Sequence, residues 1–402
     1  MNLLVLNAGS SSLKYQLIEM PSERVKCMGM VERIGMKNAL FSHEITTEVH
    51  KETLLIENHE QALNKIAETL MHPEIGVLQH VDEIEAVGHR VVHGGDKFKE
   101  TLVVTEEVKD SIRELFALAP LHNPVNLKGI EIAETIFTRA KQVAIFDTSF
   151  HQTLPKEAYQ YALPNEYLDV HKIRAYGFHG TSHKYVSEKA IAYLGKKSKR
   201  IISIHLGNGC SMSAIKEGKS IENSLGFGPM NGLVMGTRSG DIDPSVIFYL
   251  NKKLNKSTAE INELLQKESG LKGLTGHSDL RDIEKAANQG DENCLNALKI
   301  VSYRIKKFIG SYTAVLNGLD ALIFTAGIGE NSCLMRLLSC ADLDYLGIEL
   351  DPKKNEIRSK EIREIQQTDA PVKILVIPTN EELEIAKQTH ALLKNTKKSL
   401  KH

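Results

Sequence analysis

Apolar and polar positions alternate in blocks along the chain, and two of these blocks share one pattern. Leu3–Leu17 reads as an apolar strand, a turn of Asn, Gly and Ser residues, and a second apolar strand. The same pattern returns at Ile201–Gly218. Two strand–turn–strand units about 200 residues apart predict an internal duplication, in which each half contributes one loop of small residues.

Other apolar runs and helical periodicities fill the space between these units. Further strands are predicted at Glu85–Gly95, Gln142–Phe150, Ala321–Asn331 and Val372–Glu382, the third of them ending in a Gly-rich loop. Helical periodicity covers Ile112–Leu118, Tyr185–Leu194 and Leu295–Leu316. Strands mixed with helices, without low-complexity linkers, indicate α/β layers.

The last predicted helix begins near Thr379. Thr379 and Glu382 have the spacing of a capping box, and apolar residues follow at helical intervals. Because this helix comes directly after the strand at Val372, it can return to the first half of the chain. The two halves are expected to meet near residue 150.

Composition narrows the class of protein. Lys plus Arg is 50 and Asp plus Glu is 51, so the net charge of −1 gives no basic field for nucleic acid or a membrane surface. The five cysteines include no C-x-x-C pair, which fits reduced thiols. The apolar run at Leu3–Leu6 is too short for a signal peptide. We therefore expect a cytoplasmic protein.

The turn between Asn7 and Lys14 admits two interpretations. Asn, Gly and Ser dominate ordinary tight turns, but small residues, hydroxyls and a Lys also suit a phosphate. Common nucleotide signatures do not decide, because Ser213 stands where a P-loop needs its first Gly. The i, i+4 pair His89 and His93 lies in a predicted strand, where that spacing is about 13 Å and unsuited to zinc.

A resemblance decides the question. The chain resembles the acetate kinases over nearly its whole length, through motifs in the family's order and spacing: "NAGSSSLKYQL", "GHRVVHGG", "FDTSFHQTLP", "YGFHGTSHKYV", "HLGNGCSMSAI", "MGTRSGDIDP", "AGIGEN" and "PTNEELEIA".

The resemblance implies the architecture shared by acetate and sugar kinases, Hsp70 and actin. This is an α/β fold of two duplicated ribonuclease-H-like domains, each a mixed five-stranded sheet with flanking helices, with nucleotide between them. It implies an N-terminal domain over residues 1–150, completed by a helix at about 380–402. It also implies a C-terminal domain over 151–379 with the nucleotide pocket and the interface of a homodimer.

The implied reaction is reversible phosphoryl transfer from ATP to acetate, giving ADP and acetyl phosphate, with Mg²⁺ or alternatively Mn²⁺. Acetate is already ionised at neutral pH, so the obstacle is the repulsion of two anions rather than proton removal. Two unit charges 4 Å apart repel by roughly 4 kcal/mol at an effective dielectric of 20. The site should therefore supply cations, metal ligands and an apolar slot for the methyl group.

By resemblance, each of these roles has residues in this chain. The catalytic set is Asp147, His179 and Arg238, and the metal ligands are Asn7 and Glu381. The acetate site is Arg90 with the apolar wall of Val92, Leu121, Phe178 and Pro229. The nucleotide contacts are Lys14, His205, Leu206, Gly207, Asn208, Gly209, Asp279, Leu280, Arg281, Gly327, Ile328, Gly329, Glu330 and Asn331. Asp147 is expected to orient water, metal or an Arg, because acetate offers no proton to abstract. Singly, these residues have plainer explanations, since an Arg in a loop is usually a surface charge and a Val is usually core.

Some positions depart from the family's usual pattern. Ala326 replaces the first of two glycines, Gly228 and Asn231 stand where the family usually has Thr and Glu, and Cys210 replaces a more usual Ala. Since Gly228 adjoins Pro229, these departures bear on the shape of the substrate slot. A propionate or butyrate kinase therefore remains an alternative. An actin-like or Hsp70-like binding protein is a second alternative, disfavoured by the paired arginines, and a nucleic-acid-binding module is disfavoured by the neutral charge balance.

Overall fold

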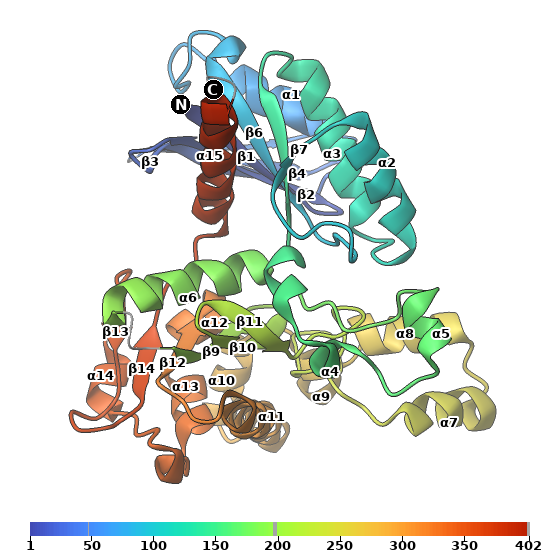
Figure 1. Cartoon of the computed structure of the whole chain (residues 1–402), viewed down its shortest axis with the longest axis vertical. Helices are drawn as coiled ribbons and strands as arrows, with labels where there is room; N and C mark the ends of the chain where they lie inside the picture. The colour runs from blue at the N-terminus through green and yellow to red at the C-terminus, as the bar shows by residue number, and fades with distance from the viewer. Residues whose placement is uncertain (47, 196–198, 400–402) are drawn as a thin grey trace. The chain divides into compact units, whose positions relative to one another are not determined.

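The computed structural model describes residues 1–46, 48–195 and 199–399. The chain divides into two compact units, and each is described by itself (Figure 1). The first unit is Met1–Ser149 together with the segment from Asn380 onward, and the second is Phe150–Thr379. Among the described residues, no helix has both the length and the apolar character needed to cross a membrane.

The first unit is built on a mixed sheet with the strand order β5-β4-β3-β2-β1-β6-β8-β7. Its strands are β1 (Asn2–Ala8), β2 (Ser12–Glu19), β3 (Arg24–Glu32), β4 (Ala39–Ile45), β5 (Glu48–Leu54), β6 (Ile84–Val91), β7 (Leu102–Val103) and β8 (Lys141–Phe146). Its helices are α1 (His59–Leu70), α2 (Glu106–Glu114), α3 (Asn123–Ile136) and α15 (Glu381–Ser399). Figure 1 shows α15 on one face of this sheet and α1 and α3 on the other.

The second unit is built on a mixed sheet with the order β11-β10-β9-β12-β14-β13. Its strands are β9 (Arg200–Leu206), β10 (Cys210–Lys216), β11 (Lys219–Asn223), β12 (Ala321–Thr325), β13 (Arg363–Glu364) and β14 (Lys373–Val376). Helices α6 (Gly180–Leu194) and α11 (Glu292–Leu316) cover its two faces (Figure 1). The remaining helices are α4 (Lys156–Tyr159), α5 (Asn165–Asp169), α7 (Pro244–Leu254), α8 (Thr258–Lys267), α9 (Gly270–Thr275), α10 (Leu280–Asn288), α12 (Ala326–Asn331), α13 (Cys333–Cys340) and α14 (Pro352–Glu356).

The two sheets share one central topology, which confirms the predicted duplicated α/β fold. In the first unit β3, β2 and β1 are antiparallel neighbours, and β6 and β8 continue the sheet in parallel. In the second unit β11, β10 and β9 are antiparallel, and β12 and β14 continue in parallel. The five-stranded set expected for each domain is thus present, and β4, β5, β7 and β13 extend it.

Two local predictions differ from the structure. The expected Gly-rich loop after β12 is the short helix α12, which starts immediately at Ala326. The expected capping box at Thr379 is wrong, because Asn380 Oδ1 accepts the backbone N–H of Leu383 at 2.9 Å. The hydroxyl and N–H of Thr379 are already bonded to Ser182 and Glu330, so the next residue caps α15. Positions 400–402 of the helix expected to end the chain lie outside the described residues.

Gly88 in β6 sets how closely α15 lies on the sheet of the first unit. A Cβ at this position would sit 2.7 Å from Ile385 Cγ2 and 2.8 Å from Thr389 Oγ1. We expect Gly88→Ala to lower the free energy of unfolding by about 1–3 kcal/mol, because overpacking forces the helix away from the strand. The measurement is urea-induced unfolding followed by circular dichroism.

The control is Gly129→Ala, where the added methyl would make only ordinary contact with Ala8 at 3.4 Å. This substitution lies in helix α3, where replacing Gly by Ala is favourable by up to about 1 kcal/mol. Equal unfolding midpoints for the two variants would contradict the packing argument.

Candidate functional site

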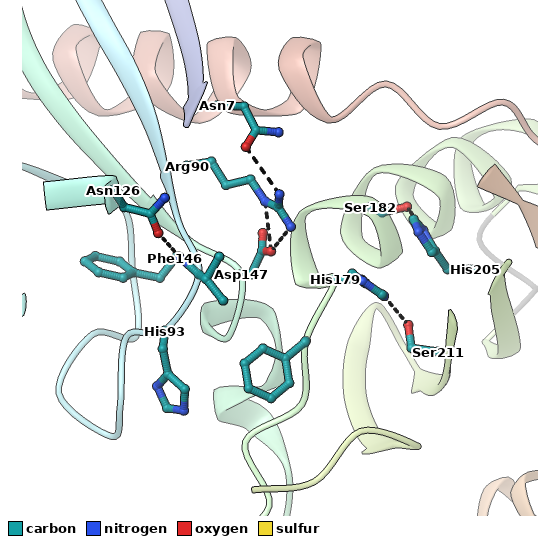
Figure 2. Close-up of polar contacts among 12 residues, drawn as sticks. Asn7, Arg90, His93, Asn126, Phe146, Asp147, His179, Ser182, His205 and Ser211 are labelled. Atoms are coloured by element: carbon teal, nitrogen blue, oxygen red, sulfur yellow. Dashed lines mark hydrogen bonds and ion pairs between the residues drawn. The ribbon is translucent and has the colours of Figure 1, made fainter. Parts of the chain in front are cut away.

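In the first unit, a charged pair forms where two parallel strands end. Arg90 is next to last in β6, and Asp147 directly follows β8, its parallel neighbour. Arg90 donates to Asp147 Oδ2 from Nε at 2.9 Å and from a terminal nitrogen at 2.5 Å. Its other terminal nitrogen donates to Asn7 Oδ1 at 3.3 Å (Figure 2). The sequence motifs of three separate strands therefore converge on one guanidinium.

The first turn of α15 adds two carboxylates to this cluster. Glu382 is buried and pairs with Lys14 of β2 at 2.5 Å. Burial disfavours the charge of Arg90, but Asp147, Glu381 and Glu382 together raise the pKa of its guanidinium. Burial raises the pKa of Glu381, Arg90 opposes this, and the neighbouring carboxylates add to it, so the net direction is upward. The cluster holds more negative charge than Arg90 and Lys14 neutralise.

The tip of the β1–β2 hairpin is held from outside by two residues that the sequence analysis did not identify. His59 Nε2 donates to the carbonyl of Gly9 at 2.7 Å, and Asn126 Nδ2 donates to the carbonyl of Ala8 at 2.8 Å. The side-chain oxygen of Asn126 accepts the N–H of Val92 at 3.1 Å. A buried Asn in a helix interior was the available signal for Asn126, because such a residue must find partners.

The predicted apolar wall is divided between the two units. Val92 and Leu121 belong to the first, and Phe178 and Pro229 belong to the second. Val92 is half-buried and directly follows the last residue of β6. Because Val92 lies outside the strand, the alternation of side chains along β6 does not place its side chain on the same face as that of Arg90. Leu121 is 55% exposed, whereas Phe178 is buried. At Gly228, beside Pro229, an added Cβ would meet no atom within 4 Å.

In the second unit, His179 and His205 lie with their rings stacked, 4.3 Å apart and inclined by 24°. His205 is next to last in β9, just before the turn of the β9–β10 hairpin. In this turn Gly207 donates its N–H to the carbonyl of Gly209 at 3.1 Å. A Cβ on Gly209 would lie 3.4 Å from the His179 ring and 3.7 Å from Arg238. The hairpin and these two side chains thus lie close together.

Among the described residues, no carboxylate forms an ion pair with Arg238. Its terminal nitrogen donates to the carbonyl of Pro229 at 2.9 Å. Burial lowers the pKa of Arg238, in contrast to Arg90, because no ion pair compensates. A half-buried guanidinium that bonds only to a neutral carbonyl and to the thioether sulfur of Met235, among the residues that the structure describes, is suited to receive an anion.

Two of the predicted adenosine residues line a small apolar cavity of about 10 Å³ inside the second unit. Leu206 and Gly207 of the hairpin, Leu280 of α10 and Ile328 of α12 line it, together with Cys210. Asp279 and Arg281 pair with each other at 2.5 Å on the exposed side of α10.

Helix α12 in this region depends on a buried arginine that the sequence did not reveal. Arg336 is almost fully buried and donates to the carbonyls of Gly329 and Glu330 and to Asn355. Burial lowers the pKa of Arg336 to about 10. Ala326, at the start of α12, has φ of 63°. This is a left-handed conformation, which Gly adopts without strain and Ala does not.

The cluster of the first unit offers oxygen donors to a metal ion. Asn7 and Asp147 bond to Arg90, and Glu381 lies near enough to perturb its charge. No group of three His, Cys, Asp or Glu side chains with metal-binding geometry occurs within residues 1–46, 48–195 and 199–399. One amide and two carboxylates with surplus negative charge fit a hard cation that keeps some of its water.

Comparison with known proteins gives a consistent result. The model of the acetokinase family matches residues 2–387. The chain is 59% identical to acetate kinase of Flavobacterium johnsoniae over 395 residues, covering 98% of this chain and 100% of that protein. The crystal structure of Porphyromonas gingivalis acetate kinase superposes with a TM-score of 0.92 at 43% identity, covering 98% and 99%. A propionate kinase from Francisella tularensis superposes with a TM-score of 0.91 at 41% identity, covering 96% and 98%.

The unpaired Arg238 predicts an anion-binding response in solution. We expect inorganic phosphate to raise the melting temperature of the protein, with a stabilisation of about 1.4 kcal/mol when phosphate exceeds its Kd tenfold. Arg238→Gln should reduce this gain, because the variant loses the half-buried cation. The measurement is differential scanning fluorimetry over a phosphate series at constant ionic strength.

Arg200→Gln is the matched control, because Arg200 is already paired with Asp320 at 2.5 Å. This variant should keep the full response to phosphate. A wild-type response in Arg238→Gln would show that the arginine does not receive anions.

Proposed function

Because the chain belongs to the acetokinase family and catalyses the acetate kinase reaction, we propose that its two units supply separate parts of one phosphoryl transfer. The reaction moves the γ-phosphoryl group of ATP to a carboxylate oxygen of acetate and is reversible. The observation that carries the proposal is the contrast between two arginines. Arg90 is fixed by a carboxylate, whereas Arg238 is half-buried and has no carboxylate partner among the described residues.

Arg90 binds the acetate carboxylate in this proposal. Asp147 holds two of its nitrogens, so the guanidinium is oriented before substrate arrives. Acetate needs no general base, and Asp147 therefore acts by positioning Arg90 rather than by removing a proton. A carboxylate oxygen placed in line with the γ-phosphorus can then attack directly.

The second unit stabilises the transferring group. Arg238 and His179 donate to the phosphoryl oxygens, where charge is spread during transfer. Lys14 and the β9–β10 hairpin, His205 to Gly209, contact the nucleotide phosphates. The adenosine part binds beside Asp279–Arg281 and Gly327–Asn331, next to the cavity that Leu280 and Ile328 line.

Asn7 and Glu381 hold the divalent cation, with Mg²⁺ proposed and Mn²⁺ as the alternative ion. When bound, such an ion neutralises phosphate charge and helps to orient the phosphoryl donor. The chain's own contribution is a cluster whose surplus negative charge is relieved by a cation. The raised pKa of Glu381 is the observation that supports this assignment.

We further propose a cytoplasmic homodimer whose interface lies on the second unit. Helix α7 has no buried residue, although Val246, Phe248, Tyr249 and Leu254 are apolar or aromatic and each is exposed. An exposed set of this kind usually marks an interaction surface. A second copy of the chain is the partner that the family resemblance implies.

Acetate is proposed as the preferred substrate, and propionate kinase activity is the second candidate because of the similar propionate kinase structure. Hydroxylamine trapping of the acyl phosphate, with ATP and either carboxylate, should give a higher kcat/KM for acetate. One methylene in an apolar pocket is worth only about 1–3 kcal/mol, so the preference should be modest. Val92→Ala should raise the propionate-to-acetate ratio by freeing the volume of two methyl groups.

Leu121→Ala provides a comparison, because this wall residue is mostly exposed and should change the ratio less. A ratio that Val92→Ala leaves unchanged would remove Val92 from the pocket. A wild-type ratio above one would identify propionate as the substrate, and no acyl hydroxamate from either acid would refute the proposed transfer.

Protons should compete with the metal at Glu381. The pKa of this carboxyl is raised, so lowering the pH protonates it sooner than an ordinary Glu and removes the ionised ligand. We expect the affinity for Mn²⁺ to fall as pH decreases from 8 to 5.5, by up to about tenfold per pH unit below the pKa. Electron paramagnetic resonance of free Mn²⁺ measures this binding without turnover.

Glu381→Gln serves as the control, because an amide does not titrate in this range. Its Mn²⁺ affinity should be weak and nearly constant with pH. The same pH dependence in wild type and variant would assign the titration to another group.

A further inference from the structure

A buried row of serine and histidine side chains runs through the second unit to His179. Ser203 Oγ lies 2.9 Å from His183 Nδ1, and Ser211 Oγ lies 2.7 Å from His183 Nε2. Ser211 Oγ also lies 2.8 Å from His179 Nδ1 (Figure 2). The exposed fraction of Ser203, His183 and Ser211 is 0% in each case. None of these three residues belongs to the site assigned above.

The backbone explains why both histidines reach one serine. His179 precedes α6 with a left-handed φ of 55°, and the N–H of His183 donates to the carbonyl of His179 at 3.0 Å. The two rings are therefore one helical turn apart. Ser211 lies on β10 and Ser203 on β9, the neighbouring antiparallel strand. The helix start and two strands thus fix all four side chains.

The number of available protons decides which group donates in each hydrogen bond of the row. If Ser203 donates to His183 Nδ1, then His183 Nε2–H donates to Ser211, and the Ser211 hydroxyl donates to His179 Nδ1. Every hydroxyl proton is then used. In the opposite order His183 donates to Ser203, and the Ser203 hydroxyl proton has no acceptor among the residues that the structure describes. A buried donor without a partner is unfavourable, so the first order is preferred.

The surroundings keep His183 neutral, as the row requires. Its ring lies 5.8 Å from that of His151 and 6.1 Å from that of His205, which belong to two other elements. Burial, followed by these two neighbours, lowers the pKa of His183 well below its usual value. A second proton on His183 would reverse one of its two hydrogen bonds with serine.

We propose that Ser203, His183 and Ser211 are positioning residues that fix His179 as the Nε2–H tautomer. His179 then donates to a phosphoryl oxygen without first taking up a proton from solution. The proposal rests on the role given to His179 above and names the residues that set its tautomer.

The direct test is ¹⁵N nuclear magnetic resonance of the full chain labelled at histidine. The chemical shift of each ring nitrogen shows whether it carries a proton, and His179→Gln assigns the signals of His179. We expect a bare Nδ1 and a protonated Nε2 in the wild type at neutral pH. In Ser211→Ala the signals should shift toward a mixture of tautomers. A wild-type His179 protonated at Nδ1 would overturn the proposal.

Kinetics provide the second measurement. Loss of a residue that orients a functional histidine typically costs 10–100-fold, so Ser211→Ala should lower kcat by about that factor. The KM values for ATP and acetate should stay within about threefold, because the contacts to ground-state substrate remain. Ser203→Ala, at the far end of the row, should have a smaller effect on kcat in the same direction.

Ser187→Ala is the matched control. Ser187 is buried like Ser211 and lies on α6, the helix that carries His183. Among the described residues, its hydroxyl bonds only to the carbonyl of Lys184 at 3.0 Å. Wild-type kcat in Ser211→Ala, or an equal loss in Ser187→Ala, would refute the positioning role. Full activity of His179→Ala would instead refute the proposed role of His179, while the ¹⁵N result on its tautomer would stand.

Discussion

Repulsion between two anions is the constraint to which both units of this protein respond. In the first unit a carboxylate holds the guanidinium of Arg90 in place, whereas in the second unit the half-buried guanidinium of Arg238 has no carboxylate partner among the described residues. A fixed pair costs little further ordering when a substrate binds, whereas an unpaired and partly desolvated cation gains most when an anion replaces its lost water. The two arginines therefore suit different tasks, orientation for Arg90 and charge stabilisation for Arg238.

Parallel strand pairing places the groups of the first unit. Arg90 and Asp147 come from distant parts of the sequence, yet β6 and β8 end side by side and bring them within hydrogen-bond distance. The acidic start of α15 reaches the same point because the helix lies against β6. Chemistry at the ends of parallel strands is thus a direct result of the topology that the two units share.

The alternation of apolar and polar residues was enough to predict the two hairpins, the duplication and the α/β class. It did not predict β4 and β5, because an edge strand such as Glu48–Leu54 has few buried positions and little contrast between its faces. Among candidate site residues, the motifs pointed to Arg90, near the end of strand β6, and to His179, directly before helix α6. They could not identify Asn126, Arg336 or Ser211, whose importance lies in partners far away in sequence. The cap at Asn380 was missed because the preceding Thr379 has the same cap-forming chemistry and only its tertiary partners exclude it.

The position of α15 has a consequence for how the chain is made. Strands β1 and β6 leave the ribosome early, but the helix that covers one of their faces is encoded last. The second unit lies wholly between these segments and has all of its strands before α15 is synthesised. The face of the first unit around Gly88 therefore stays uncovered until the last segment of the chain docks on it. A nascent chain that stops before Asn380 would also lack Glu381, so incomplete products would contain the second unit's arginine and histidines but not the full charge cluster of the first.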